Sequence, residues 1–244
     1  MSTLRSAAVA AVLARLIAAG DREDGAGKAR VLARERELGH KVYGRERAEL
    51  YRTAPIAVTP AVGELLYVLA AASGAHRIVE FGSSLGFSTI HLAAAVRDMG
   101  AGTVITTELD VRKAELAAAN FQQAGLADLI DVRVGDARQT LADVPSPVDM
   151  LFLDGWNDLY LDVLALVERR LRSGALVVAD LSADDPASDA YRTRLEDPAS
   201  GYLTTTIPLD AGVVISVRRG PSEGIPHDDH PRVEALRTMC HRAS

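Results

Sequence analysis

Acidic side chains stand at the ends of several apolar, strand-like segments of this 244-residue chain. Glu108 closes the segment TVITTE, Asp136 follows LIDVRVG, and Asp154 follows VDMLFL. A carboxylate can accept hydrogen bonds from both hydroxyls of a ribose, and the pair Asp136-Ala137 suits the edge of an adenine ring. Because the carboxyl ends of neighbouring parallel strands meet in one crevice, we expect these side chains to form a single binding site.

A glycine-containing loop, GSSLGFST (82–89), follows the first apolar segment. Gly82 and Gly86 can let the backbone approach a ligand, and the helix that follows offers its N-terminal amides. A dinucleotide fingerprint needs glycines at its third and sixth positions, where this loop has Ser84 and Phe87. The loop therefore favours a ligand without a pyrophosphate. Any one of these loops could be an ordinary strand-end turn. Three such loops at the ends of successive strands indicate an adenosine-bearing cofactor.

Apolar, β-rich segments alternate with helical segments through the middle of the chain. This alternation predicts a parallel sheet with helices on both faces. Two later strand segments are joined across DAG (210–212), which predicts a terminal antiparallel hairpin. The expected fold class is α/β, with a doubly wound, seven-stranded, mostly parallel sheet. Strands are expected at residues 76–82, 102–110, 129–136, 148–155 and 174–181.

The helical segments define the remaining organisation. Residues 1–50 predict two or three helices, with a break at DREDGAGK (21–28), and Thr59 is expected to cap a helix that begins at Pro60. Between the strands, helices are expected at 88–99, 111–125, 137–144 and 159–171. We expect three regions, namely a helical extension, a cofactor-binding domain and a polar tail with a short terminal helix: 1–54, 55–220 and 221–244.

Composition excludes several functional classes. A formal net charge of −6 argues against a nucleic-acid-binding surface. No apolar run approaches the roughly 20 residues of a membrane helix, and Arg15 interrupts the N-terminal run, which favours an amphipathic helix over a signal peptide. The single cysteine, Cys240, excludes an internal disulfide and fits a reducing compartment. We therefore expect a cytoplasmic protein with no nucleic-acid or membrane partner.

Three segments together resemble the class I S-adenosylmethionine-dependent methyltransferases, and specifically the catechol and caffeoyl-CoA O-methyltransferase family. They are VEFGSSLGFSTIHLA, TTELD and DMLFLDGWNDLYLDVLALVERRLRSGALVVAD, and the similarity extends from Val58 to Arg219. The resemblance implies the Rossmann-like methyltransferase fold with S-adenosylmethionine as cofactor. It also implies a small-molecule acceptor, such as a phenol or a hydroxylated natural product, and a homodimer formed by the N-terminal helices and the last strands.

The resemblance also assigns cofactor contacts. Glu108 would hold the ribose, while Asp136, Ala137 and Trp156 would frame the adenine. Core or interface packing is the alternative for Trp156, the only tryptophan. Asp154 would lie beside the reacting groups. The methionine moiety would be surrounded by residues of the glycine-containing loop and of the segment before Pro60: Val58, Thr59, Glu80, Gly82, Ser84, Gly86 and Ser88.

A divalent metal, such as Mg²⁺, and a catalytic lysine are further implications of the resemblance. Asp154 and Asp180 match two metal ligands, but Leu181 stands at the position of the third, an asparagine, and Asn157 stands at the lysine position. Leucine cannot ligate a metal, and asparagine cannot act as a base near neutral pH. Magnesium held by two carboxylates stays open, because Mg²⁺ often keeps several waters. Candidate replacement ligands are Ser182, Asp184 and Asp185.

Without a metal, catalysis would rest on proximity and on the catalytic candidates Asp154 and Asn157. Other candidate bases are Asp158, Tyr160 and His40, for which surface or packing roles are the alternatives. The sequence HDDH (227–230) is more typical of a solvated tail than of a second metal site.

Two rival functions remain. An NAD-dependent oxidoreductase would use Glu108 for the cofactor's ribose, but the missing glycines and the terminal hairpin disfavour it. A degenerate methyltransferase fold that acts as a binding or regulatory module would explain Asn157 and Leu181. The intact cofactor loops argue against that second rival.

Overall fold

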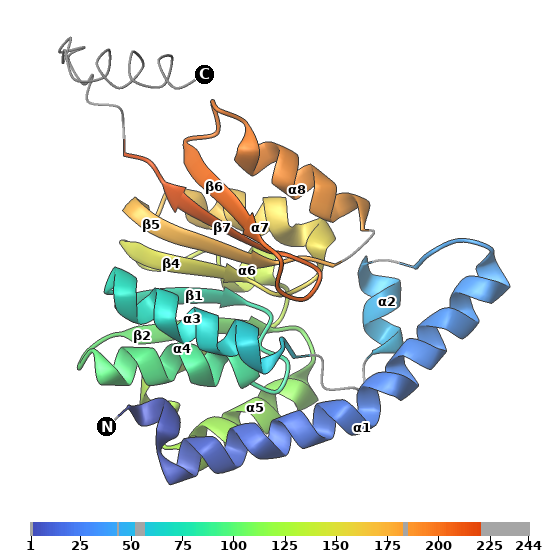
Figure 1. Cartoon of the computed structure of the whole chain (residues 1–244), viewed down its shortest axis with the longest axis horizontal. Coiled ribbons are helices and arrows are strands. Elements are labelled where there is room, and N and C mark those ends of the chain that lie inside the picture. Colours follow the sequence, from blue (N-terminus) through green and yellow to red (C-terminus); the bar gives the residue numbers. More distant parts are fainter. Residues whose placement is uncertain (1, 43, 52–56, 183–184, 221–244) are drawn as a thin grey trace, which may run out of the picture.

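The computed structural model describes residues 2–42, 44–51, 57–182 and 185–220, and it contains a seven-stranded sheet between helical layers (Figure 1). The strand order is β3-β2-β1-β4-β5-β7-β6, in which β1 to β5 are parallel and β7 is antiparallel to both neighbours. This arrangement confirms the predicted fold class and the terminal hairpin. The strands are β1 Arg77–Phe81, β2 Thr103–Glu108, β3 Ile130–Val134, β4 Val148–Leu153, β5 Leu171–Asp180, β6 Tyr202–Ile207 and β7 Val213–Arg218.

Two separate helical layers cover the sheet. One core includes residues of α1 (Ala7–Leu38), α3 (Pro60–Ser73), α4 (Phe87–Asp98) and α5 (Val111–Ala124). The other includes residues of α6 (Ala137–Thr140), α7 (Tyr160–Glu168) and α8 (Pro186–Glu196). A short helix, α2 (Gly44–Leu50), packs against α1. The 3₁₀ turns are η1 Thr3–Arg5, η2 Ala127–Leu129 and η3 Asn157–Leu159.

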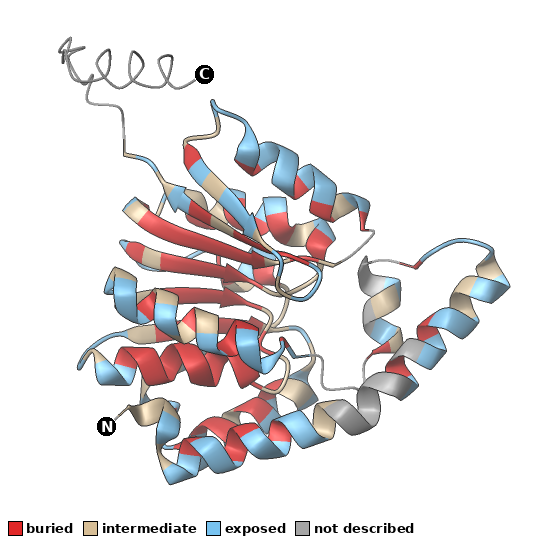
Figure 2. Cartoon of the chain, viewed as in Figure 1, coloured by how far each residue is buried: buried red, intermediate tan, exposed pale blue. Residues whose placement is uncertain are grey.

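Strand β4 shows why apolar residues occupy successive positions in the central strands. Met150 and Phe152 belong to one core, whereas Leu151 and Leu153 belong to the other. Successive side chains of a strand point to opposite faces, so a sheet covered on both sides needs apolar residues without alternation. Figure 2 shows the central strands as buried along most of their length.

The N-terminal region corrects one prediction. Helix α1 runs without interruption through residues 21–28, where the sequence predicts a break, and it ends at Gly39 in a left-handed conformation. The segment has no proline, and each glycine inside a helix costs only about 1 kcal/mol relative to alanine. Tertiary contacts help to hold α1, because Arg15 donates to the side chains of Asn120 and Gln123 on α5 at 2.8 Å.

The linkage continues from α1 to the glycine-containing loop. Asn120 is buried, and its Nδ2 donates to the main-chain oxygen of Leu85 at 2.8 Å. Helix α3 begins at Pro60 as predicted, but the Thr59 hydroxyl makes no capping hydrogen bond. The Thr59 N–H instead approaches Asp210 Oδ2 in the β6–β7 turn, at 3.4 Å.

The predicted terminal helix and the HDDH sequence lie outside the described residues. Within the part of the chain that the structure describes, no helix has the length and apolar character needed to cross a membrane.

Gly86 supports a first prediction about stability. Its φ is 90°, and an added Cβ would lie 2.2 Å from a ring carbon of Phe121. Gly100 has a φ of 88° with open space around it. We expect Gly86→Ala to lower the free energy of unfolding by about 2–4 kcal/mol, and Gly100→Ala by only about 1 kcal/mol. Urea denaturation measures both, and equal losses would show that the Phe121 contact is unimportant.

Candidate functional site

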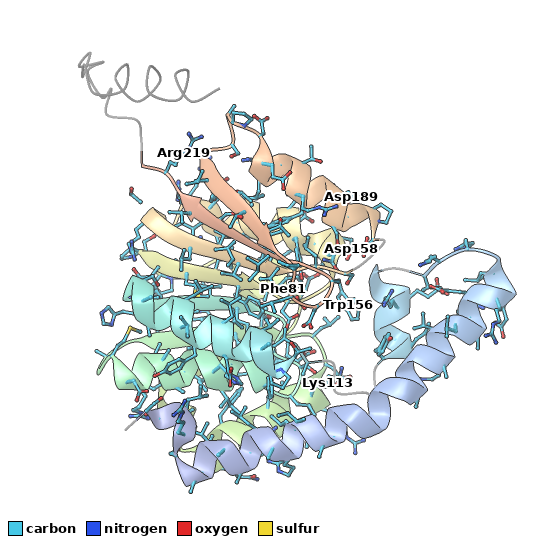
Figure 3. All side chains as sticks on the ribbon, in the orientation of Figure 1. Phe81, Lys113, Trp156, Asp158, Asp189 and Arg219 are labelled. Carbon is cyan, nitrogen blue, oxygen red and sulfur yellow. The ribbon has the colours of Figure 1, made fainter. Side chains whose placement is uncertain are left out.

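Two adjoining cavities lie at the carboxyl ends of the parallel strands. Their volumes are about 300 and 220 Å³, and Gly82, Glu108 and Trp156 line both of them. In Figure 3, the labelled Phe81, Trp156 and Asp158 lie together at this end of the sheet. The first cavity is also lined by Phe81, Thr107, Leu109, Gly135, Asp136, Ala137, Arg138, Asp158 and Leu159.

Glu108 is fixed between the two cavities by backbone amides. Its Oε2 accepts a hydrogen bond from the N–H of Ser84 at 2.8 Å, and its Oε1 accepts one from the N–H of Asp110 at 2.9 Å. Burial raises the pKa of Glu108, while these amides and the charge of Lys113 act in the opposite direction. The carboxylate is therefore oriented before any ligand binds, and its remaining lone pairs can accept hydroxyl groups.

Asp136 stands at the far side of the first cavity, where it caps α6. Its Oδ1 accepts from the N–H of Arg138 at 2.9 Å, and the Arg138 side chain forms an ion pair with it at 2.6 Å. Ala137 is buried directly after it. The first cavity thus combines a small apolar residue and an acidic edge with Trp156, whose indole is shared with the second cavity.

The second cavity contains a pair of acids. Asp154 follows β4 and Asp180 ends β5, and both line this cavity beside the buried Asn157. Desolvation raises the pKa of Asp154 well above its usual value, and the charges of Asp180, Glu80 and Asp210 add to the effect. Desolvation and the charge of Asp210 raise the pKa of Asp180 to about 7. The two acids therefore compete for protons near neutral pH.

Several buried polar atoms around the crevice have no hydrogen-bond partner among the described residues. They are Glu80 Oε1, Ser83 Oγ, Ser84 Oγ, Asn157 Nδ2 and Asp180 Oδ1. Ser84 also adopts a positive φ of 47°, a conformation that non-glycine residues rarely adopt without a local reason. Buried polar groups are normally paired, so this concentration indicates a surface that a polar ligand completes.

Five predicted cofactor residues lie outside the walls of both cavities: Val58, Thr59, Glu80, Gly86 and Ser88. Val58 is packed in the core, Thr59 is exposed and Ser88 is buried at the start of α4. Their contacts with a cofactor stay predictions. The other predicted residues, Gly82, Ser84, Glu108, Asp136, Ala137, Asp154, Asn157, Trp156 and Asp180, are brought together along the crevice.

Glu80 and Gly86 have clear local roles in the fold. Glu80 has no exposed surface, and its Oε2 accepts from the hydroxyls of Thr89 at 2.5 Å and Thr106 at 2.6 Å. Burial raises the pKa of Glu80. Gly86 leaves the space that the Phe121 ring occupies.

Sequence reasoning missed three residues of the second cavity, namely Arg47, Tyr51 and Lys113. Lys113 could have been predicted to lie near the site, because it is in the first turn of α5, five residues after Glu108. Arg47 and Tyr51 could not, because the N-terminal helices reach the crevice only through tertiary packing.

The acids of the second cavity do not reproduce the expected metal site. The described residues include no group of three or more His, Cys, Asp or Glu side chains placed to hold a metal. Leu181 is buried in an apolar core at the position where a third ligand is expected. Asp185, a candidate replacement, accepts from the N–H of Ala187 at 2.9 Å and caps α8, while Asp184 lies outside the described residues. This donor set does not fit a three-ligand magnesium site.

Comparison with known proteins places these features in context. A family model described as "Methyltransferase domain" matches residues 79–180. The chain is 39% identical over 134 residues to a catechol O-methyltransferase of Mycobacterium tuberculosis, in an alignment that covers 54% of this chain and 59% of that protein. The chain therefore spans less than two thirds of that relative's length.

Two further similarities cover more of the matched proteins. A putative O-methyltransferase of Mycolicibacterium smegmatis is 33% identical over 180 residues, which cover 66% of this chain and 83% of that protein. The crystal structure of the O-methyltransferase TomG from Streptomyces achromogenes, in complex with S-adenosylmethionine, is 28% identical with a TM-score of 0.63. That alignment covers 71% of this chain and 87% of TomG.

The raised pKa of Asp180 predicts how stability depends on pH. An acid whose folded-state pKa is raised holds its proton more tightly when folded, so its contribution to stability falls as pH rises from about 4 to about 7. We expect Asp180→Asn, in EDTA, to be more stable than the parent at pH 8 by about 1–3 kcal/mol, with no such gain at pH 4.5. Thermal unfolding at both pH values measures the difference. The exposed Asp162→Asn is the control, and a gain that is independent of pH would contradict the argument.

Proposed function

This chain belongs to the S-adenosylmethionine-dependent O-methyltransferases of the catechol and caffeoyl-CoA type, and we propose that it transfers a methyl group to a hydroxyl oxygen of a small molecule. The observation that carries the proposal is Glu108, a carboxylate oriented by two amides between one cavity suited to an adenine and another lined by acids. This is the arrangement that a cofactor with a central ribose requires.

We place the adenine in the first cavity, beside Ala137 and Trp156, with its polar edge toward Asp136. The ribose hydroxyls donate to Glu108, and the methionine moiety continues along the glycine-containing loop toward Ser84. The unpartnered hydroxyl oxygens of Ser83 and Ser84 support this placement, because both can hydrogen-bond a polar ligand there. The methyl group then points into the second cavity.

Methyl transfer is a direct displacement, in which a carbon–oxygen bond forms as the carbon–sulfur bond breaks. The sulfur leaves as a neutral thioether, and the acceptor hydroxyl loses its proton. Holding the acceptor oxygen in line with the methyl carbon supplies most of the rate enhancement that proximity can give. We propose that Asn157 Nδ2 donates a hydrogen bond to the acceptor oxygen, since this amide is buried and has no partner among the described residues.

The proton of the acceptor requires a base near the second cavity. We propose that the Asp154–Asp180 pair takes this proton, because the raised pKa of Asp180, about 7, suits a general base near neutral pH. No step of this mechanism uses a metal. Asn157 and Leu181 would also fit the rival reading, in which the protein binds a cofactor without turnover. The homodimer and the cytoplasmic location expected from the sequence stay predictions.

Cofactor binding can be tested directly by calorimetry. We expect S-adenosylhomocysteine to bind the EDTA-treated protein with micromolar affinity, about −8 kcal/mol, and Glu108→Gln to weaken binding about tenfold or more through lost charge-assisted hydrogen bonds. Glu115→Gln, an exposed glutamate on the following helix α5, is the matched control. Absence of binding by the parent protein would falsify the proposed function.

Metal dependence and turnover form a separate test. We expect transfer of a labelled methyl group to a catechol-type acceptor to continue in excess EDTA, because the described residues include no third His, Cys, Asp or Glu placed to hold a metal. Asp154→Ala should lower kcat about 100-fold or more while it leaves S-adenosylhomocysteine affinity nearly unchanged. Restoration of activity only by Mg²⁺ would contradict the metal-free mechanism. Cofactor binding without turnover on any hydroxylated acceptor would favour the binding-module alternative.

A further inference from the structure

Two basic side chains line the same cavity as the acid pair. Arg47 comes from α2, Lys113 comes from the first turn of α5, and the cavity that they share with Asp154 and Asp180 has a volume of about 220 Å³. In Figure 3, Lys113 lies near the start of α5, and in Figure 1 this region faces the N-terminal helices. The cavity is therefore lined both by acids at the strand ends and by basic side chains from α2 and α5.

Neither cation has an ion-pair partner within the described part of the chain. The guanidinium carbon of Arg47 lies 5.7 Å from the centroid of the Tyr51 ring, an interaction that orients the charge without neutralising it. Lys113 Nζ donates a long hydrogen bond, 3.5 Å, to the main-chain oxygen of Tyr51. Glu108 and Asp110 act on Lys113 through their charges, but among the described residues neither carboxylate lies within ion-pair distance of its ammonium.

Keeping an unpaired ammonium half-buried is unfavourable. Burial lowers the pKa of Lys113, which shows that its charged form loses hydration in this position. Two such cations beside one cavity indicate a ligand that brings a negative charge. The adenine and ribose of the cofactor carry none, and the family resemblance places its methionine carboxylate near Ser88, which does not line this cavity. An anionic group on the acceptor would supply the missing charge.

We propose, on the basis of the proposed methyl transfer, that the acceptor is a hydroxy acid of about one ring's size, whose carboxylate binds Arg47 and Lys113 while its hydroxyl reaches Asp154 and Asn157. A planar carboxylate matches the forked donors of a guanidinium. A cavity of about 150 Å³ is enough for benzene, so the second cavity has room for one substituted ring.

The test compares two probes of nearly the same shape, 3,4-dihydroxybenzoate and 3,4-dihydroxybenzamide, in which a neutral amide replaces the carboxylate. Each is titrated by calorimetry into the full-length protein saturated with S-adenosylhomocysteine. We expect the acid to bind about tenfold more tightly than the amide, and Arg47→Gln and Lys113→Met to remove most of that preference. Arg47→Lys keeps the positive charge but loses the paired N–H donors of the guanidinium. This variant should therefore retain part of the preference for the acid over the amide.

Controls separate this inference from the proposed function. Arg36→Gln changes an exposed arginine of α1 that lines neither cavity, and it should leave the preference intact. S-adenosylhomocysteine affinity should stay within about threefold in Arg47→Gln, which also shows that this variant is folded. Because Lys113 acts on Glu108 through its charge, Lys113→Met is judged only by the ratio of its affinities for the two probes.

Equal affinity for the two probes, failure of the acid to bind, or loss of the preference in Arg36→Gln overturns the inference while the proposed function stands. A large loss of S-adenosylhomocysteine affinity in Arg47→Gln assigns this cation to the cofactor and also overturns it. If the parent protein binds no S-adenosylhomocysteine, it is the proposed function that fails.

Discussion

Burial of several carboxylates at the carboxyl end of the sheet is the constraint around which the site is arranged. Desolvation is the main cause of the raised pKa values of Glu80, Asp154 and Asp180, and repulsion from neighbouring acids adds to it. Glu80 is accommodated by two threonine hydroxyls, whereas Asp154 and Asp180 are left to share protons or to meet a ligand. The fold tolerates this cost because the apolar strands behind the acids are buried on both faces.

The loop that faces these acids is held from behind by the N-terminal helix. Arg15 of α1 contacts Asn120, and Asn120 in turn holds the main chain of Leu85. Phe121, the next residue of α5, occupies the space beside Gly86. The strained backbone of Ser84 is thus supported by packing from α5, and its N–H remains directed at Glu108. A series of hydrogen bonds and packing contacts thus links helix α1, the glycine-containing loop and Glu108.

Local patterns were sufficient for the strands and for the acids that follow them. Glu108, Asp136, Asp154 and Asp180 were predictable because β/α alternation fixes which chain positions reach the carboxyl edge of the sheet. The uninterrupted α1 was not predictable. The helix propensities of residues 21–28 favour a break, whereas contacts with the rest of the fold stabilise a continuous helix. Helix α8 could have been predicted from Asp185 and Pro186, because a capping residue followed by proline is typical of a helix start. The helices predicted from the sequence do not include it.

The least predictable residues are those that α2 and its C-terminal end bring to the crevice. No local sequence pattern predicts that Arg47 and Tyr51 line a cavity with acids more than 100 positions later in the chain. Their placement depends on how α1 and α2 pack against the rest of the fold. Gly86 illustrates a different limit. A glycine next to a ligand and a glycine next to a phenylalanine have the same appearance in a sequence.

The position of α2 in the chain has a consequence for how such proteins diversify. The methyltransferase family match covers residues 79–180, a contiguous stretch that carries Glu108, Trp156 and both acids, whereas Arg47 and Tyr51 lie upstream of it. Of the residues to which we assign acceptor binding, Arg47 therefore lies outside the family match, whereas Lys113, Asp154 and Asn157 lie inside it. Exchange of residues 1–51 between homologues would change the cavity wall that α2 supplies and leave Glu108 and Trp156 in place. Relatives that share only the central stretch can therefore differ in this wall.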